Sequence, residues 1–553
     1  MSMTAPPPSD GEPQTMAEAA PRRATGVAAR SWAPVAVVFA LFTGWSIAFI
    51  ERTLVVAYDG RRVPCLFDDA MVSMRYAWNL VHHHGLVWNP GERVEGYSNL
   101  LQTLSMAALI ELFGKFRSIF AVQVMGLLTL AGAAVFAVRL AADLAREQGL
   151  EDTPAWRGIA AFVALSYYPL GYWSLMGMET GLLALTVTGA AYYALRVPAD
   201  EVSRAFVCLS ALAVLTRPDA VVPIAVIFLF RHLSPPRRTR VALREGVALL
   251  GVVVATVAFR RLYYRSWIPN TYLLKVSGYT LGYRLANGWA FVRRFLWTAA
   301  LPLGIAVAGL VLRPRRRQAL LVTLFLVAVG YQIWIGGDAW VYWRFLAPTV
   351  PLLVLAAIAP LRAVIRDSMD PPRTGGTAWS VPLARQAVVM AVLGLSLWNL
   401  DARFIRELRF GRPPYELELH QRNVNVGLAL LEVTTGEATV GVFGAGTIPY
   451  FSERRGEDFL GKCSPQVAAL PPDLSGSTAM FGMRARPGHN KYDLAYSILL
   501  CRPTYIDRAW WGQQDVSDQA AALYTKAFYH GVRLNLLSGS PDVLWAKLDA
   551  RTP

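Results

Sequence analysis

The sequence predicts a polytopic α-helical membrane protein with a soluble C-terminal α/β domain, and three observations support this fold class. Hydrophobic residues make up 54% of the 553 residues, charged residues make up only 17%, and the mean hydropathy is +0.35. A soluble enzyme of this size is less apolar. Apolar runs of about 20 residues, the length of a membrane helix, alternate with short arginine-rich links up to residue 400.

The N-terminus is predicted to be a cytoplasmic tail followed by a retained membrane helix. Residues 1–32 are rich in Pro, Ala and Ser and show no apolar periodicity, which predicts a disordered segment. The run from Ser31 to Ile50 is long enough to span a membrane, and Arg22, Arg23 and Arg30 precede it. No small-residue cleavage site follows, which favours a first helix over a signal peptide.

The later apolar segments extend the expected transmembrane domain over residues 33–400, with about eleven crossings. The positive-inside rule places the basic links in the cytoplasm together with the N-terminus, so an odd number of crossings leaves the C-terminal part outside. The same rule explains the net charge of +16 without nucleic-acid binding. The expected helices are 33–55, 119–141, 157–174, 180–196, 204–216, 219–231, 244–260, 298–312, 319–335, 344–361 and 382–400.

Two segments leave the helix count open. The stretch from Leu100 to Phe113 is apolar but shorter than a span, which predicts a helix at the outer interface. The sequence Thr216-Arg217-Pro218-Asp219 either separates two short helices or interrupts one, since proline disfavours helix continuation.

Residues 401–553 are predicted to form an extracytoplasmic α/β domain, because the apolar runs shorten and strand-like pieces appear. One such piece, Ala438–Phe443, precedes Gly444-Ala445-Gly446. The third glycine of a nucleotide fingerprint is missing, so a plain strand-to-turn connection is favoured over dinucleotide binding. Cys463 and Cys501 both fall here, and a disulfide between them is plausible in an oxidising compartment. The four cysteines show no metal-ligand spacing.

The adjacent carboxylates Asp68 and Asp69 mark the expected first outer loop, residues 56–118, as a candidate active site. Partial desolvation beside apolar side chains raises the pKa of a carboxylate, which suits it to accept a proton from a hydroxyl. With the expected topology, further polar residues converge on the same side, where ionisable groups usually mark a site. They are Glu179, Arg217, Asp219, Asn270, Tyr272, Lys275, Asp338 and Arg344.

Each of these residues also has a purely structural interpretation. Arg217 can pair with Asp219, Pro269-Asn270 can form a turn, and Glu179 can cap a helix. The cations of Arg75, Arg217, Lys275 and Arg344 could instead neutralise a phosphate leaving group. Tryptophans near the outer boundary fit an aromatic belt better than a sugar site. The run His82-His83-His84 is more typical of a solvated segment than of a metal site, because consecutive side chains diverge.

Several ordered motifs resemble one family. They are Asp68-Asp69-Ala70-Met71-Val72-Ser73-Met74-Arg75-Tyr76-Ala77, the segment from Gly85 to Asn99, Leu215-Thr216-Arg217-Pro218-Asp219, Ile268-Pro269-Asn270-Thr271-Tyr272, Gly336-Gly337-Asp338 and Pro487-Gly488-His489-Asn490-Lys491. This set is similar to integral-membrane glycosyltransferases of the GT-C fold, and within them to actinobacterial terminal arabinofuranosyltransferases and their bacterial relatives.

The resemblance implies a polyprenyl-phosphate-linked sugar donor, a catalytic aspartate on the first outer loop and an inverting transfer outside the cytoplasm. By position, Asp68 or Asp69 matches the family's aspartate pair. Arg217, Asn270, Tyr272, Asp338 and His489 match its other polar motifs. The chain departs from the family at Asn490, where an acidic residue is frequent, and in its Leu274-Lys275 arrangement.

The resulting prediction is a polyprenyl-phosphate-sugar-dependent glycosyltransferase in a bacterial inner membrane. Its expected partners are the lipid bilayer, the lipid-linked donor and a glycan or glycoconjugate acceptor, without nucleic acid. Arabinofuranose is one candidate sugar. No cofactor or metal is expected, because fixed cations can neutralise the leaving phosphate. The alternative is a transporter or flippase for a lipid-linked sugar, which would need a midplane site and predicts an internal repeat. A non-catalytic membrane scaffold would leave the aspartate pair without a role.

Overall fold

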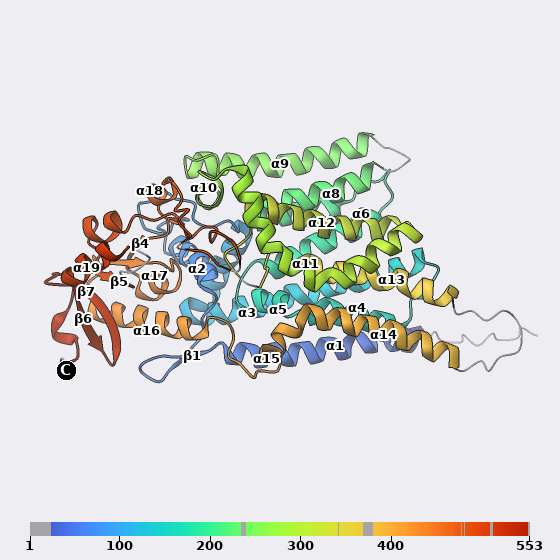
Figure 1. Cartoon of the computed structure of the whole chain (residues 1–553), viewed down its shortest axis with the longest axis horizontal. Coiled ribbons are helices and arrows are strands. Elements are labelled where there is room, and N and C mark those ends of the chain that lie inside the picture. The colour runs from blue at the N-terminus through green and yellow to red at the C-terminus, as the bar shows by residue number, and fades with distance from the viewer. Residues whose placement is uncertain are drawn as a thin grey trace, which may run out of the picture.

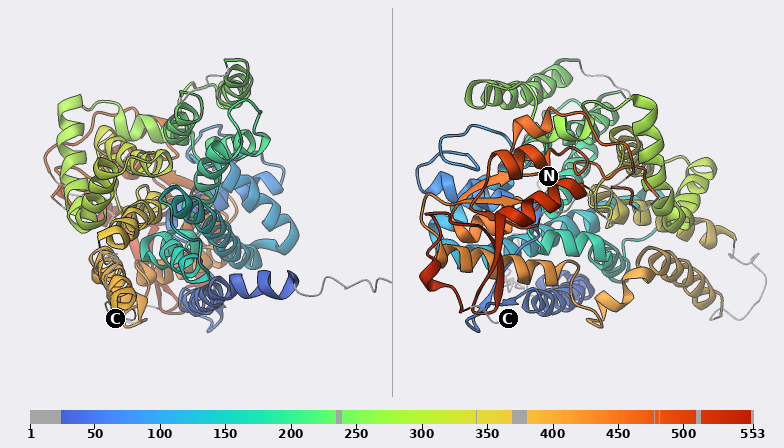
Figure 2. Two further views of the ribbon diagram at one scale, coloured as in Figure 1. Left: turned by 90° about the vertical axis from the view of Figure 1, so that its right-hand side faces the viewer. Right: turned by 60° about the vertical axis from the view of Figure 1, so that its left-hand side comes forward.

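The computed structural model describes residues 24–550 except 234–238, 341, 369–379, 477, 481 and 509–512. Long helices lie side by side along the long axis of the molecule. The C-terminal part, from residue 402 on, contains a sheet and covers one end of these helices (Figures 1 and 2). The predicted disordered tail, residues 1–32, lies mostly outside the described residues. Its last part belongs to the first helix, Ala24–Arg52.

The helical part contains fourteen described α-helices up to residue 401. They are α1 Ala24–Arg52, α2 Asp68–Val81, α3 Leu100–Glu147, α4 Pro154–Ser166, α5 Tyr168–Leu175, α6 Thr180–Arg196, α7 Arg204–Thr216, α8 Val221–His232, α9 Thr239–Tyr263, α10 Asn270–Val276, α11 Leu281–Leu312, α12 Arg316–Ile335, α13 Val350–Ser368 and α14 Ser380–Asp401. A short hairpin, β1 Val55–Val56 and β2 Arg62–Val63, precedes α2.

Seven stretches of helix among the described residues are long and apolar enough to cross a membrane. The chain is therefore a multi-pass membrane protein by composition and helix length, while the expected eleven crossings stay a prediction. The seven are Trp32–Arg52, Leu100–Glu147, Thr239–Tyr263, Leu281–Leu312, Arg316–Ile335, Ala347–Ser368 and Ala384–Leu408.

Three breaks in the helices have local causes. The helix α3 bends at Gly114, which has φ 73° and ψ −176°, at the end of the apolar segment predicted to be separate. The expected single helix 157–174 is broken at Tyr167, because Pro169 lacks an N–H and its ring would clash with the carbonyl four residues earlier. Helices α7 and α8 are likewise two elements, separated by the extended residue Arg217 and the 3₁₀ turn Pro218–Ala220.

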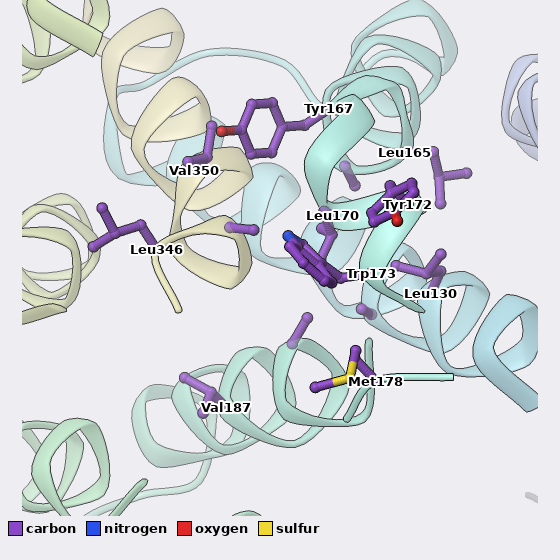
Figure 3. Packing of buried hydrophobic residues seen from close by; sticks show 14 of the residues in the cluster. Leu130, Leu165, Tyr167, Leu170, Tyr172, Trp173, Met178, Val187, Leu346 and Val350 are labelled. Carbon is purple, nitrogen blue, oxygen red and sulfur yellow. The ribbon is translucent and has the colours of Figure 1, made fainter. Parts of the chain in front are cut away.

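An aromatic core anchors the loop that carries the aspartate pair. Trp173 of α5 is fully buried, and its indole N–H donates to the Tyr342 carbonyl over 3.0 Å. Phe67, which directly precedes Asp68, packs edge-on against Trp173 with ring centroids 5.0 Å apart. Figure 3 shows the Trp173 ring of α5 among side chains of α6 and of the segment that contains Leu346. The start of α2 is thus fixed to the helical bundle by apolar packing.

The C-terminal part contains a five-stranded sheet in the order β4-β3-β5-β7-β6. Strand β3 runs parallel to β4 and β5, whereas β7 runs antiparallel to β5 and β6. The strands are β3 Thr439–Val442, β4 Arg455–Asp458, β5 Tyr505–Ile506, β6 Tyr524–Tyr529 and β7 Val532–Leu537. Its helices are α15 Ile405–Leu408, α16 Leu417–Val433, α17 Thr447–Ser452, α18 Pro465–Ala468 and α19 Gln514–Leu523.

The carboxyl ends of the neighbouring parallel strands β3 and β4 meet at one edge of this sheet, the place where open α/β sheets present their binding loops. Gly444-Ala445-Gly446 follows β3, and a turn from Phe459 to Cys463 follows β4. Cys463 lies at the end of that turn as a buried free thiol, and Cys501 is also free. The disulfide considered plausible from the sequence is therefore not formed. That the sheet is soluble and extracytoplasmic stays a prediction.

Candidate functional site

A cavity of about 520 Å³ lies between the helical bundle and the C-terminal part. The start of α2, the segment after α12 and α10 contribute its walls on the bundle side. Helix α16 and the loops after β3 and β4 close it on the other side. Its charged lining residues are Asp68, Asp69, Glu179, Arg217, Asp219, Lys275, Arg344, Glu416, Asp458, Lys462, Arg486, Asp507 and Arg508.

Asp68 binds the loop after β3. Its Oδ1 accepts hydrogen bonds from the Thr447 N–H over 2.8 Å and from the Thr447 hydroxyl over 2.9 Å, and its Oδ2 accepts from the Gly446 N–H over 3.2 Å. Burial raises the pKa of Asp68, although the two hydrogen bonds from Thr447 oppose the shift. Because the carboxylate is occupied by the loop, Asp68 mainly joins the C-terminal part to α2.

Asp69 faces the cavity and is held by cations from both parts of the chain. Its Oδ2 accepts from Arg344 Nη1 over 2.6 Å and from the Trp340 indole N–H over 3.3 Å, while its Oδ1 contacts Lys462 Nζ. Burial alone would raise the pKa of Asp69, but Lys462 and Arg344 outweigh it and hold the pKa well below its usual range. Asp69 is therefore an ionised carboxylate between two cations.

The turn after β4 presents Lys462 to Asp69. Asp458, the last residue of β4, accepts from the Leu460 N–H over 3.0 Å and from the Cys463 N–H over 2.6 Å, which fixes the turn. From the bundle side, the Asn270 amide donates to the carbonyls of Gly461 and Lys462 over 2.8 and 3.0 Å. The backbone of the turn is fixed by both parts of the chain, and the Lys462 side chain extends from it.

Asp69 belongs to a cluster of five charged side chains that carries a positive surplus. Arg344 forms a bidentate pair with Asp338 over 2.8 and 3.1 Å, and Lys275 Nζ lies 3.7 Å from Asp338. Together with Lys462 and Asp69, this cluster contains three cations and two carboxylates. Its surplus of one positive charge matches the single negative charge of a phosphodiester.

Arg217 belongs to a second cluster with the opposite balance. Its Nε and Nη2 donate to Asp219 over 2.8 and 2.9 Å, and its Nη1 donates to Glu179. The pairing of Arg217 with Asp219, the structural interpretation of the sequence, is observed. Glu179 precedes α6 without capping it and also accepts from Asn99 over 3.1 Å. With two carboxylates on one guanidinium, Arg217 has less positive charge to offer a phosphate than the cluster at Asp69.

The loop around His489 forms another wall of the cavity. The His489 ring packs edge-on against Trp340 with centroids 5.6 Å apart, and the Arg486 guanidinium lies over Trp340 at 4.4 Å. Burial, with the nearby charge of Arg486, holds the pKa of His489 well below its usual value. His489 is therefore a neutral ring here. Tyr272, on α10, also lines the cavity and is 40% exposed.

Two residues predicted to contact the donor lie outside the cavity lining. Arg75 is buried behind it, and its guanidinium donates to the carbonyls of Trp88 and Arg454 over 3.2 and 3.1 Å. Asn270 is occupied by the turn of Lys462. Lys491, beside His489 in the sequence, donates to the carbonyls of Leu273 and Ala468 instead of facing the cavity. In this structure all three side chains donate to backbone carbonyls.

Sequence reasoning missed Lys462 and Arg486. Both side chains come from the C-terminal part, and only tertiary contacts bring them to the loop of Asp69. The one local signal was the strand-like segment ending at Asp458, whose following turn reaches a sheet edge. Among the described residues, no group of three or more His, Cys, Asp or Glu side chains is arranged to hold a metal ion.

No family model matches the sequence. The structure is similar to ArnT from Cupriavidus metallidurans bound to undecaprenyl phosphate, with a TM-score of 0.52, 12% identity, and coverage of 94% of this chain and 99% of that chain. The chain has the GT-C fold. A second GT-C structure, the archaeal oligosaccharyltransferase AglB from Archaeoglobus fulgidus with an inhibitory peptide and a dolichol-phosphate, gives a TM-score of 0.50 at 12% identity, over 92% of this chain and 74% of that chain.

A sequence relative shares part of this GT-C chain. A terminal beta-(1->2)-arabinofuranosyltransferase from Corynebacterium glutamicum is 26% identical over 375 residues, or 60% of this chain. The chain spans about half the length of this curated relative, since the match covers 51% of it. The resemblance found in the sequence motifs thus agrees with both the structural and the sequence comparison.

Proposed function

We propose that this GT-C protein transfers a sugar from a polyprenyl-phosphate donor to the hydroxyl of an envelope glycan or glycoconjugate, with inversion at C1. The observation that carries the proposal is the cavity in which an ionised carboxylate, Asp69, lies within a cluster that has a surplus positive charge. The two GT-C neighbours, one bound to undecaprenyl phosphate and one to a dolichol-phosphate, support a lipid-phosphate donor.

In this mechanism Asp69 is the general base. The acceptor oxygen attacks C1 of the sugar, its proton passes to Asp69, and the C1–O bond to the phosphate breaks with its electron pair remaining on the phosphate. Arg344, Lys462 and Lys275 stabilise the charge that develops on the leaving group. Asp68 is a positioning residue, because its carboxylate is bound by Thr447 and Gly446. With three cations at the phosphate, the reaction needs no metal or cofactor.

Arabinofuranose is the sugar that we propose, on the strength of the arabinofuranosyltransferase relative. The site would face the outer side of a bacterial inner membrane, where lipid-linked donor and glycan acceptor can meet. A transporter or flippase is the second candidate. A cavity at one end of the helices, closed by the C-terminal part, favours transfer over transport, since alternating access needs a site near the bilayer midplane.

The proposal is tested by replacing each aspartate with asparagine in a transfer assay that uses a polyprenyl-phosphate sugar in proteoliposomes. Asp69→Asn should lower kcat by about 10²–10⁴-fold, because it removes the base while preserving shape. Asp68→Asn should keep more activity, since its amide oxygen can still accept from Thr447. Asp200→Asn, an exposed site far from the cavity, is the control. Full activity of Asp69→Asn would exclude Asp69 as the base.

A further inference from the structure

The base and the phosphate-binding cations contact each other in the structure. Asp69 Oδ2 accepts from Arg344 Nη1 over 2.6 Å, and Asp69 Oδ1 contacts Lys462 Nζ. A carboxylate that is paired with two cations is a weak proton acceptor, because its charged form is strongly favoured. In this arrangement the proposed base is least basic when no donor is present.

The two cationic donors on Asp69, Arg344 and Lys462, are also those that a phosphate can take at the lowest cost. Two other nitrogens of Arg344, Nε and Nη2, form the bidentate pair with Asp338. Arg344 Nη1 and Lys462 Nζ instead point to Asp69, whose side chain is 19% exposed at the cavity. A phosphate oxygen at this position would replace one carboxylate by one anion without breaking the pair with Asp338.

The Lys462 side chain can follow such an exchange. The backbone of its turn is held by Asp458 and Asn270, whereas the side chain itself is 25% exposed. Its flexible four-carbon stem lets the ammonium move between two neighbouring anions. Because the backbone of the turn is fixed, the Lys462 ammonium stays within reach of both the Asp69 carboxylate and an incoming phosphate.

Resting on the proposed function, we propose that Asp69 occupies the phosphate position of the donor-free protein and that the donor phosphate displaces it from Arg344 and Lys462. Displacement removes two cations from Asp69 and places a negative charge beside it, and both changes favour uptake of a proton. The carboxylate thus becomes an effective base only after the donor has bound. The donor binds first, and the acceptor hydroxyl is deprotonated second.

The test is the affinity of the purified full chain in nanodiscs for undecaprenyl phosphate, measured without any acceptor or transfer. Asp69→Asn should bind this probe roughly tenfold more tightly than the unmodified protein, because the competing anion is gone. Lys462→Met should bind it more weakly. Asp518→Asn, the same substitution on the exposed surface of the C-terminal part, should bind like the unmodified protein. The alcohol undecaprenol should show no difference among these proteins.

Removing Asp69 takes one carboxylate partner from Arg344 and from Lys462, which lowers the stability of the variant. Asp69→Ala is therefore measured as well, and the probe should raise the melting temperature of both variants more than that of the unmodified protein. Equal or weaker binding by both variants would overturn the displacement. If the unmodified protein itself fails to bind undecaprenyl phosphate, the proposed function fails, which is a distinguishable outcome.

Discussion

At the scale of single residues, Lys275 is the cation of the cluster at Asp69 whose pKa is lowered, while the pKa values of Arg344 and Lys462 are raised. Burial lowers its pKa to about 8, the neighbouring Arg344 and Arg217 act in the same direction, and Asp338 opposes them. Lys275 is therefore charged below this pH and loses its proton above it. Asp69 behaves differently, since its low pKa keeps it ionised throughout the neutral range.

Donor binding should consequently weaken as the pH rises through about 8, because Lys275 becomes neutral and the phosphate loses one cation. Lys275→Arg should remove this dependence, since a guanidinium stays protonated. The measurement is the affinity for undecaprenyl phosphate on both sides of this pH, with both proteins at each pH, so that titration of the probe itself cancels. The same pH profile in Lys275→Arg would assign the transition to another group.

At the scale of elements, the loop after β3 fits against α2 because it contains Gly446. A Cβ on Gly446 would lie 2.0 Å from the Asp68 carbonyl oxygen and 2.8 Å from the Val72 nitrogen. Its φ of −101° is one that other residues also adopt. Glycine is therefore required here by the close approach of the two backbones. The contact brings the N–H groups of residues 446 and 447 to the Asp68 carboxylate.

Gly446→Ala should therefore separate the C-terminal loop from α2 at a cost of about 1–3 kcal/mol, as expected for overpacking against backbone atoms. The measurement is the melting temperature in detergent, followed by the transfer rate. Gly436→Ala is the matched control, because a Cβ there meets no atom within 4 Å. A melting temperature equal to that of Gly436→Ala would show that the loop after β3 accommodates the added methyl group without a loss of stability.

The elements also show where sequence reasoning succeeds and where it stops. The predicted helices 180–196 and 204–216 coincide with α6 and α7, because apolar length and basic ends are local signals. The predicted start of helix 298–312 was wrong, since α11 begins at Leu281. The polar residues in the first part of α11 interrupt the apolar run on which the prediction was based. Asp69 could be identified as a candidate site residue from the sequence of its own loop, because two adjacent carboxylates follow an apolar run there. Lys462 could not be identified from the sequence, because its role depends on its tertiary contact with Asp69.

At the scale of the whole molecule, the cavity and the long helices define two opposite ends. Helix α6 begins one residue after Glu179, which lines the cavity, and ends at Arg196, from which a short turn leads to α7. That turn contains the exposed Asp200, while α19 of the C-terminal part contains the exposed Gln519. Figure 1 shows α19 at the end opposite to the far ends of α6 and α8. If the bundle spans the membrane along its long axis, we expect these two residues to lie on opposite sides of it.

Labelling of introduced cysteines should show that the cavity faces outward. In a background that carries Cys208→Ser and Cys501→Ser, Gln519→Cys should react with a membrane-impermeant maleimide in intact cells or spheroplasts. Asp200→Cys should react only after permeabilisation, because the positive-inside rule places the arginine-rich turns of its end in the cytoplasm. Each variant is the control for the other, since both are labelled with the same reagent in the same background. The reverse pattern would place the proposed site in the cytoplasm, where the donor phosphate would have to be supplied from the inner leaflet.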